Sequence, residues 1–106
     1  MGGMLFAFSV APTVTDSADG SVSEAVAAAV RVVRESGLPN ETTAMFTTIE
    51  GEWDEVMPVI KAACDAVAAH SPRVSLVLKA DLRPGYEGQL SAKVERVERH
   101  LQDDGA

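Results

Sequence analysis

The sequence predicts an α+β domain of the ferredoxin-like class: a four-stranded antiparallel sheet in a βαββαβ order, with an extra C-terminal helix. Two observations carry this prediction. Apolar residues alternate with polar or small ones along 4–10 and 73–81, which is a strand pattern, and they recur at helical spacing in segments between and after these strands. Both main helices should cover one face of the sheet.

The first strand is predicted at 4–10, with its large side chains on one face. The first helix follows a polar loop and opens on a capping box formed by Ser21 and Glu24. It should end near Ser36, because Gly37 suits a helix C-terminus and Pro39 cannot continue the helix. Its expected core stripe is Val22, Val26, Ala29, Val30 and Val33.

Residues 41–50 are predicted to form two strands joined by a tight turn near Phe46 and Thr47. A second helix should begin after a turn at Gly51, with acidic residues in its first turn. Pro58 is expected to delay or kink this helix. Its expected core stripe is Val56, Ile60, Ala63, Cys64 and Val67.

The last predicted strand, 73–81, directs Val74, Leu76, Leu78 and Ala80 to the core. The opposite sheet face would carry small and mixed residues, suited to a ligand or a second subunit. A final helix is predicted, with one face formed by Leu90, Val94, Val97 and Leu101.

Length and composition indicate a single domain, expected at 4–102, with residues 1–3 preceding a natural start at Met4 and a frayed tail at 103–106. The formal net charge of -7 disfavours nucleic acids and anionic membranes. The only cysteine, Cys64, excludes an internal disulfide. A cytoplasmic protein is therefore expected.

No catalytic constellation is visible in the sequence, so no catalytic residues and no enzyme activity are predicted. A hydrolytic triad needs a base near a nucleophile, and the only histidines are His70, expected at a helix end, and His100, in the charged last helix, so both are interpreted as structural or solvated. No spacing of Cys and His indicates zinc. The acids near position 50 could hold a hard cation only in principle, so neither a metal nor a cofactor is expected.

The segment 47–57 is the most informative part of the chain, because it combines the only tryptophan, Trp53, with four acidic residues. Glu50 and Trp53 at a strand-to-helix corner could bind a flat cation. They could also be a helix start and a packing anchor, which is the interpretation that the spacing alone favours.

The sequence resembles the small thiamine-binding proteins of the YkoF-like type. The resemblance covers most of the chain and is carried by 8–12, 21–24, 35–38, 45–56 and 93–98. It implies a ferredoxin-like homodimer or tetramer that binds thiamine or its pyrimidine half without catalysis. Ala7 and Phe46 depart from the family pattern. The carry-over implies these ligand-binding positions: Ser9, Ser23, Thr47, Glu50 and Trp53.

The leading functional hypothesis is non-catalytic binding of thiamine or a related hydroxymethylpyrimidine compound by a homo-oligomer, for buffering, sensing or delivery. A second hypothesis is a ligand-free oligomeric interaction or regulatory module. A third, less favoured for want of a base–nucleophile pair, is a small-molecule enzyme.

Overall fold

The computed structural model describes residues 4–13 and 22–82, together with residues 90, 95, 97–99 and 101. The expected helix start at Ser21, and Val94 and His100 further on, lie outside the described residues. Within residues 4–82, the described part of the chain forms β1 (Met4–Pro12), α1 (Val22–Glu35), β2 (Asn40–Thr42), β3 (Thr47–Gly51), α2 (Trp53–Ala68) and β4 (Val74–Asp81). No described helix is long and apolar enough to cross a membrane.

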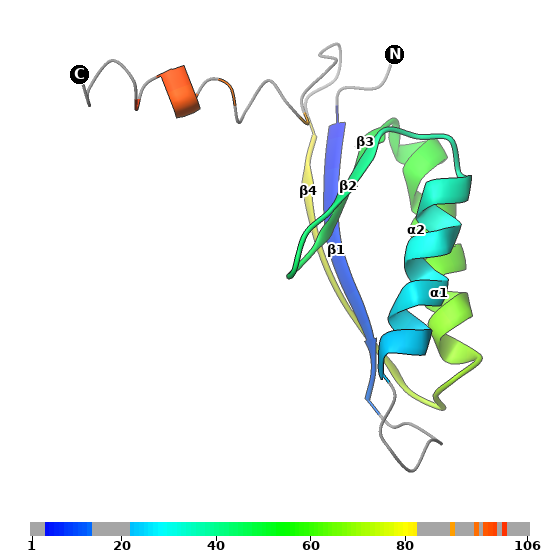
Figure 1. Cartoon of the computed structure of the whole chain (residues 1–106). Helices are drawn as coiled ribbons and strands as arrows, with labels where there is room; N and C mark the ends of the chain where they lie inside the picture. Colours follow the sequence, from blue (N-terminus) through cyan, green and yellow to red (C-terminus); the bar gives the residue numbers. More distant parts are fainter. Residues whose placement is uncertain are drawn as a thin grey trace.

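The four strands form one antiparallel sheet in the order β2-β3-β1-β4, and both helices lie on one face of it (Figure 1). This arrangement confirms the predicted α+β, ferredoxin-like fold. The longest strand, β1, is central, and its even-numbered residues from Met4 to Val10 are buried against the helices. The alternation in the sequence therefore correctly identified the core face of β1.

The two ladders of β1 differ in length. Its pairing with β4 runs from Leu5 to Pro12, whereas its pairing with β3 runs only from Met4 to Phe8. Beyond Phe8, the β3-side edge of β1 has no partner among the described strands. We call this gap the notch. It is bordered by the β2–β3 loop, residues 43–46, and by α1 on the helix face of the sheet.

The predicted turn near Phe46 and Thr47 was wrong, because Thr47 already belongs to β3 and the loop occupies 43–46. Thr43 closes this loop without a glycine. Its main-chain N–H donates to the Phe46 carbonyl at 2.8 Å, and its Oγ1 accepts from the Phe46 N–H at 3.3 Å. The hydroxyl of Thr43 thus stabilises the loop in place of a turn glycine, which is absent from this part of the sequence.

The predicted core stripe of α1 was displaced by one residue at its start. The buried residues are Ala25, Ala29 and Val33, whereas Val22 and Val26 are exposed. Small alanines let α1 approach the sheet and α2 closely, which turns the bulkier valines outward. The α2 stripe was predicted correctly at Val56, Ile60, Ala63 and Val67, with Cys64 half-buried.

The start of α2 is not delayed by Pro58, contrary to one prediction, because the helix begins at Trp53. The N–H of Glu52 donates to Glu55 Oε1 at 3.0 Å, which caps the first turn. Pro58 lies on the exposed side, where water can hydrate the carbonyl that loses its partner. Gly51 extends β3 rather than forming a turn, and Val56 lies so close that a Cβ there would meet its Cγ2 at 2.8 Å.

On β4 the predicted face is correct but its burial is incomplete. Leu76 and Leu78 lie opposite Val10 and Phe8, on the helix side of the sheet, yet Leu76 is 43% exposed. The reason is that β4 is an edge strand, whereas the helices pack mainly over β1. Among the described C-terminal residues, Val97 and Leu101 are helical and exposed.

Candidate functional site

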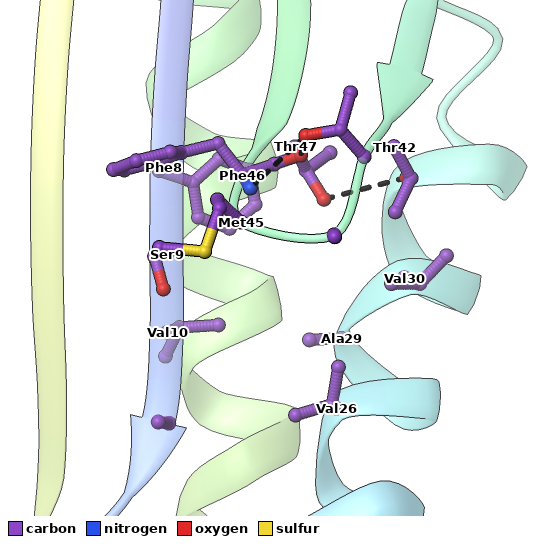
Figure 2. Close-up of a pocket in the computed structure, with 13 residues that line it drawn as sticks. Phe8, Ser9, Val10, Val26, Ala29, Val30, Thr42, Met45, Phe46 and Thr47 are labelled. Atoms are coloured by element: carbon purple, nitrogen blue, oxygen red, sulfur yellow. Dashed lines mark hydrogen bonds between the residues drawn. The ribbon is translucent and has the colours of Figure 1, made fainter.

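The notch holds a pocket of about 180 Å³ on the helix side of β1 (Figure 2). Three elements surround it: the end of β1, the middle of α1, and the segment that joins β2 to β3. Its lining is Phe8, Ser9, Val10, Ala11, Val26, Ala29, Val30 and residues 42–47. In Figure 2 the thioether of Met45 extends toward Ser9 across this space. The pocket exists because the β2–β3 hairpin ends short of the end of β1.

Three threonine hydroxyls supply much of the polar character of the pocket. Thr42 Oγ1 and Thr47 Oγ1 lie 3.4 Å apart across the hairpin, and Thr43 Oγ1 belongs to the loop contacts described above. Thr47 is 8% exposed, so its hydroxyl faces the pocket from a largely dry position. Hydroxyls can donate and accept, which suits a ligand with mixed polar groups.

Apart from Ser9, the remaining lining is apolar, and none of the lining residues has an ionisable side chain. Phe8 is buried, whereas Phe46 and Met45 are exposed at the loop. Aromatic rings and a thioether favour contact with a flat ring. A pocket without a charge cannot compensate a buried ion, so this arrangement suits an uncharged planar group.

The structure brings together two of the five residues proposed from the family resemblance. Ser9 and Thr47 both line the pocket. Ser23 lies in a shallow groove of about 740 Å³ along the outer side of α1. This groove shares Val26, Val30 and Thr42 with the pocket, so Ser23 is a neighbour of the site rather than part of its wall.

Glu50 and Trp53 lie elsewhere in the fold. Glu50 pairs with Leu5 on the sheet face that the helices do not cover, and it is only 6% exposed. Its Oε1 accepts from the Leu90 N–H at 3.5 Å. Trp53 starts α2 and meets Phe6 edge-to-face, with ring centroids 5.8 Å apart. Neither residue lines the pocket.

The sequence reading missed several residues that line the pocket, among them Thr42, Met45 and Phe46. The signal for them was the run of threonines and apolar residues between the two hairpin strands. That signal could not be used because the turn was placed two residues too late along the chain. Once the loop is set at 43–46, its side chains fall directly beside the end of β1.

Chemically reactive groups are sparse in the part of the chain that the structure describes. No cluster of three His, Cys, Asp or Glu residues there is arranged to hold a metal ion. Burial, and secondarily the charge of Asp65, raise the pKa of the Cys64 thiol above its ordinary value. A raised thiol pKa lowers the fraction of nucleophilic thiolate at neutral pH.

Comparison with known proteins decides the family. A family model described as "Thiamine-binding protein" matches residues 6–98. This chain belongs to that family. A UPF0045 protein of Mycobacterium bovis is 54% identical over 99 residues, which cover 92% of this chain and 94% of that protein. A UPF0045 protein of Synechocystis is 37% identical over 84 residues, covering 78% and 69%.

Solved structures share the fold. A hypothetical protein from Methanocaldococcus jannaschii superimposes with a TM-score of 0.78 at 32% identity, covering 90% of this chain and 95% of that one. A domain of unknown function from Bacillus cereus gives 0.71 at 34% identity, with 81% and 82% covered. A Thermotoga maritima protein, for which a role in thiamine biosynthesis or salvage has been proposed, gives 0.75 at 26% identity, with 89% and 97% covered.

The role of Glu50 can be tested with Glu50→Gln on two readouts. Because Glu50 lies outside the pocket lining and accepts from Leu90, we expect a stability loss of about 1 kcal/mol and thiamine affinity changed by less than about threefold. Thermal denaturation and calorimetry measure the two effects.

Glu41→Gln is the matched control, since Glu41 is an exposed acid on β2 that pairs with Thr48, which lies two residues before Glu50 on β3. An affinity loss of roughly 10- to 150-fold in Glu50→Gln alone would instead make Glu50 a ligand contact, as the family resemblance suggested.

Proposed function

We propose that this chain is a cytoplasmic homo-oligomer that binds thiamine, or its hydroxymethylpyrimidine half, without chemical turnover. Membership of the thiamine-binding protein family and the likeness to the Thermotoga maritima protein support a thiamine-related role. The single observation that carries the proposal is the pocket in the notch, which combines hydroxyls and aromatic rings without a charge. Buffering, sensing or delivery of the ligand would each use this site.

The pocket fits one ring of thiamine better than the whole molecule. Its volume of about 180 Å³ is below the roughly 300–1,000 Å³ typical of sites for drug-sized ligands. The uncharged aminopyrimidine suits the apolar walls, whereas the thiazolium carries a permanent positive charge that is costly to bury unpaired. We therefore place the pyrimidine inside, between Phe8 and the 43–46 loop, and the thiazolium at the mouth.

The Thr47 hydroxyl would orient the ring from the helix side of the sheet. Ser9 belongs to the odd-numbered residues of β1, which face away from the helices, so it would contact the ring at the rim of the pocket. Ser23 could contact a ligand that extends along α1. Only the family resemblance proposes Glu50 and Trp53 as contacts, whereas their places outside the pocket lining favour structural roles for both. The name of the family describes binding, and the lining offers no base–nucleophile pair. These two observations favour binding over catalysis.

Thiamine and its pyrimidine half should both bind and be recovered unchanged. At a ligand concentration of about 100 times the dissociation constant, stability should rise by roughly 2.7 kcal/mol. Calorimetry and thermal-shift measurements detect the binding, and mass spectrometry of the ligand detects turnover. Absence of heat at millimolar concentrations of both compounds would contradict the proposal, and a modified ligand would contradict its non-catalytic part.

Thr47→Val should weaken thiamine binding by roughly 2- to 12-fold, because it removes one neutral hydrogen bond while keeping the side-chain shape. Calorimetry measures the change. Thr48→Val is the matched control, since Thr48 is the next residue of β3 but pairs with Ala7 on the opposite sheet face. Equal affinities for the two variants would remove Thr47 from the site.

The protein should form dimers or larger homo-oligomers. The sheet face opposite the helices exposes Val77 (56%), and the described C-terminal residues Val97 and Leu101 are also exposed. Apolar surface of this kind favours association between copies of a small domain. Sedimentation velocity at micromolar concentration measures the mass, and a single species near 11.2 kDa would contradict the prediction.

A further inference from the structure

The main chain of β1 directs its hydrogen-bonding groups alternately to β4 and to β3, as in any central antiparallel strand. The contact just beyond the ladder fixes which residues face which side. Thr13 N–H donates to the Arg73 carbonyl at 3.0 Å, one step past the Pro12–Val74 pair. Odd-numbered residues of β1 therefore bond to β4, and even-numbered residues face β3.

The hydrogen bonds of β3 show independently that the even-numbered residues of β1 face β3. Glu50 N–H donates to the Pro39 carbonyl at 2.9 Å, which directs the main chain of Glu50 toward the β2 side. By alternation Thr47, Ile49 and Gly51 face β1. Their partners in the register are Phe8, Phe6 and Met4, all even-numbered.

Val10 is the next even-numbered residue after Phe8, and it lies beyond the end of the β3 ladder. Its main-chain N–H and C=O consequently point into the notch, where no described residue pairs with them. Val10 is only 8% exposed and lines the pocket. Pro12, which would face the same edge one step later, has no N–H to leave unpaired.

A buried main-chain donor and acceptor without partners are costly, so native proteins pair nearly all of them with protein, ordered water or ligand. The two groups of Val10 lie on one strand edge and point the same way. A planar heterocycle with an acceptor nitrogen beside an amino donor matches this pair. The acceptor nitrogen would take the Val10 N–H, and the amino group would donate to the Val10 carbonyl.

We propose that Val10 recognises its ligand through its main chain, and that the ligand class is a planar heterocycle with adjacent acceptor-nitrogen and amino-donor groups. In effect the ligand replaces the missing continuation of β3. This inference rests on the proposed function, since the aminopyrimidine half of thiamine presents such an edge. To the proposed function it adds the main-chain atoms that would hydrogen-bond to the ring, and it explains why the ligand needs an amino group.

The direct test is nuclear magnetic resonance on ¹⁵N-labelled protein with an aminopyrimidine labelled with ¹⁵N in its ring. The Val10 amide proton should move downfield on binding, and a ¹⁵N–¹⁵N coupling through the hydrogen bond should join it to a ring nitrogen. The amides of Ser9 and Ala11 are the internal controls. Both are odd-numbered and bond to β4, so their shifts should move much less.

A ligand pair tests the carbonyl half without altering the protein. The analogue with hydrogen in place of the amino group should bind roughly 5- to 150-fold more weakly, because it leaves the buried Val10 carbonyl without a donor. Calorimetry compares the two compounds under identical conditions. Equal affinities would overturn the inference, as would calorimetric binding of the aminopyrimidine with an unmoved Val10 amide and no coupling.

These outcomes separate the two proposals. Binding without involvement of Val10 would refute the main-chain recognition and leave thiamine binding in place. Absence of binding by thiamine and by the aminopyrimidine would refute the proposed function, and the inference with it.

Discussion

The unequal ladders of β1 are the constraint on which the site depends. One side of β1 is bonded to β4 as far as Pro12, which keeps the strand extended and fixes the direction of its main chain. The other side loses its partner after Phe8. The helix α1 covers the core face of the same stretch, so the gap becomes a pocket with walls rather than an open edge. A rigid strand with one unpaired side is a well-defined surface for a small ligand.

The sequence predicted the fold correctly where a strand or helix has one face buried in the core. Alternation along β1 and the helical stripe of α2 predicted the core correctly, because large apolar residues there have one dry side and one wetter side. The α1 stripe was less accurate, since Val22 and Val26 look like core residues yet small alanines make the close contacts. Which residue size fits where two helices cross depends on how close the neighbouring element lies. The sequence of one helix alone does not reveal that distance.

The site was harder to predict than the fold. Ser9 and Thr47 were identified through the family resemblance, and both line the pocket, whereas Glu50 and Trp53 belong to other parts of the domain. The loop at 43–46 was misplaced because Thr43 closes it with its hydroxyl, and no glycine marks it. The end of the β1–β3 ladder depends on that loop, and therefore no local pattern around Val10 could reveal its unpaired main chain.

The short β2–β3 hairpin has a consequence for how such a domain could gain or lose its ligand. A hairpin longer by one further hydrogen-bonded pair would present its own main chain to Val10 and would occupy the space now bordered by Met45 and Phe46. The protein would complete its sheet and close the pocket in a single step. In the proposed binding mode, ligand and strand are competing solutions to the same unpaired edge, so an insertion or deletion in one loop would decide whether the edge is open to a ligand or closed by the protein itself.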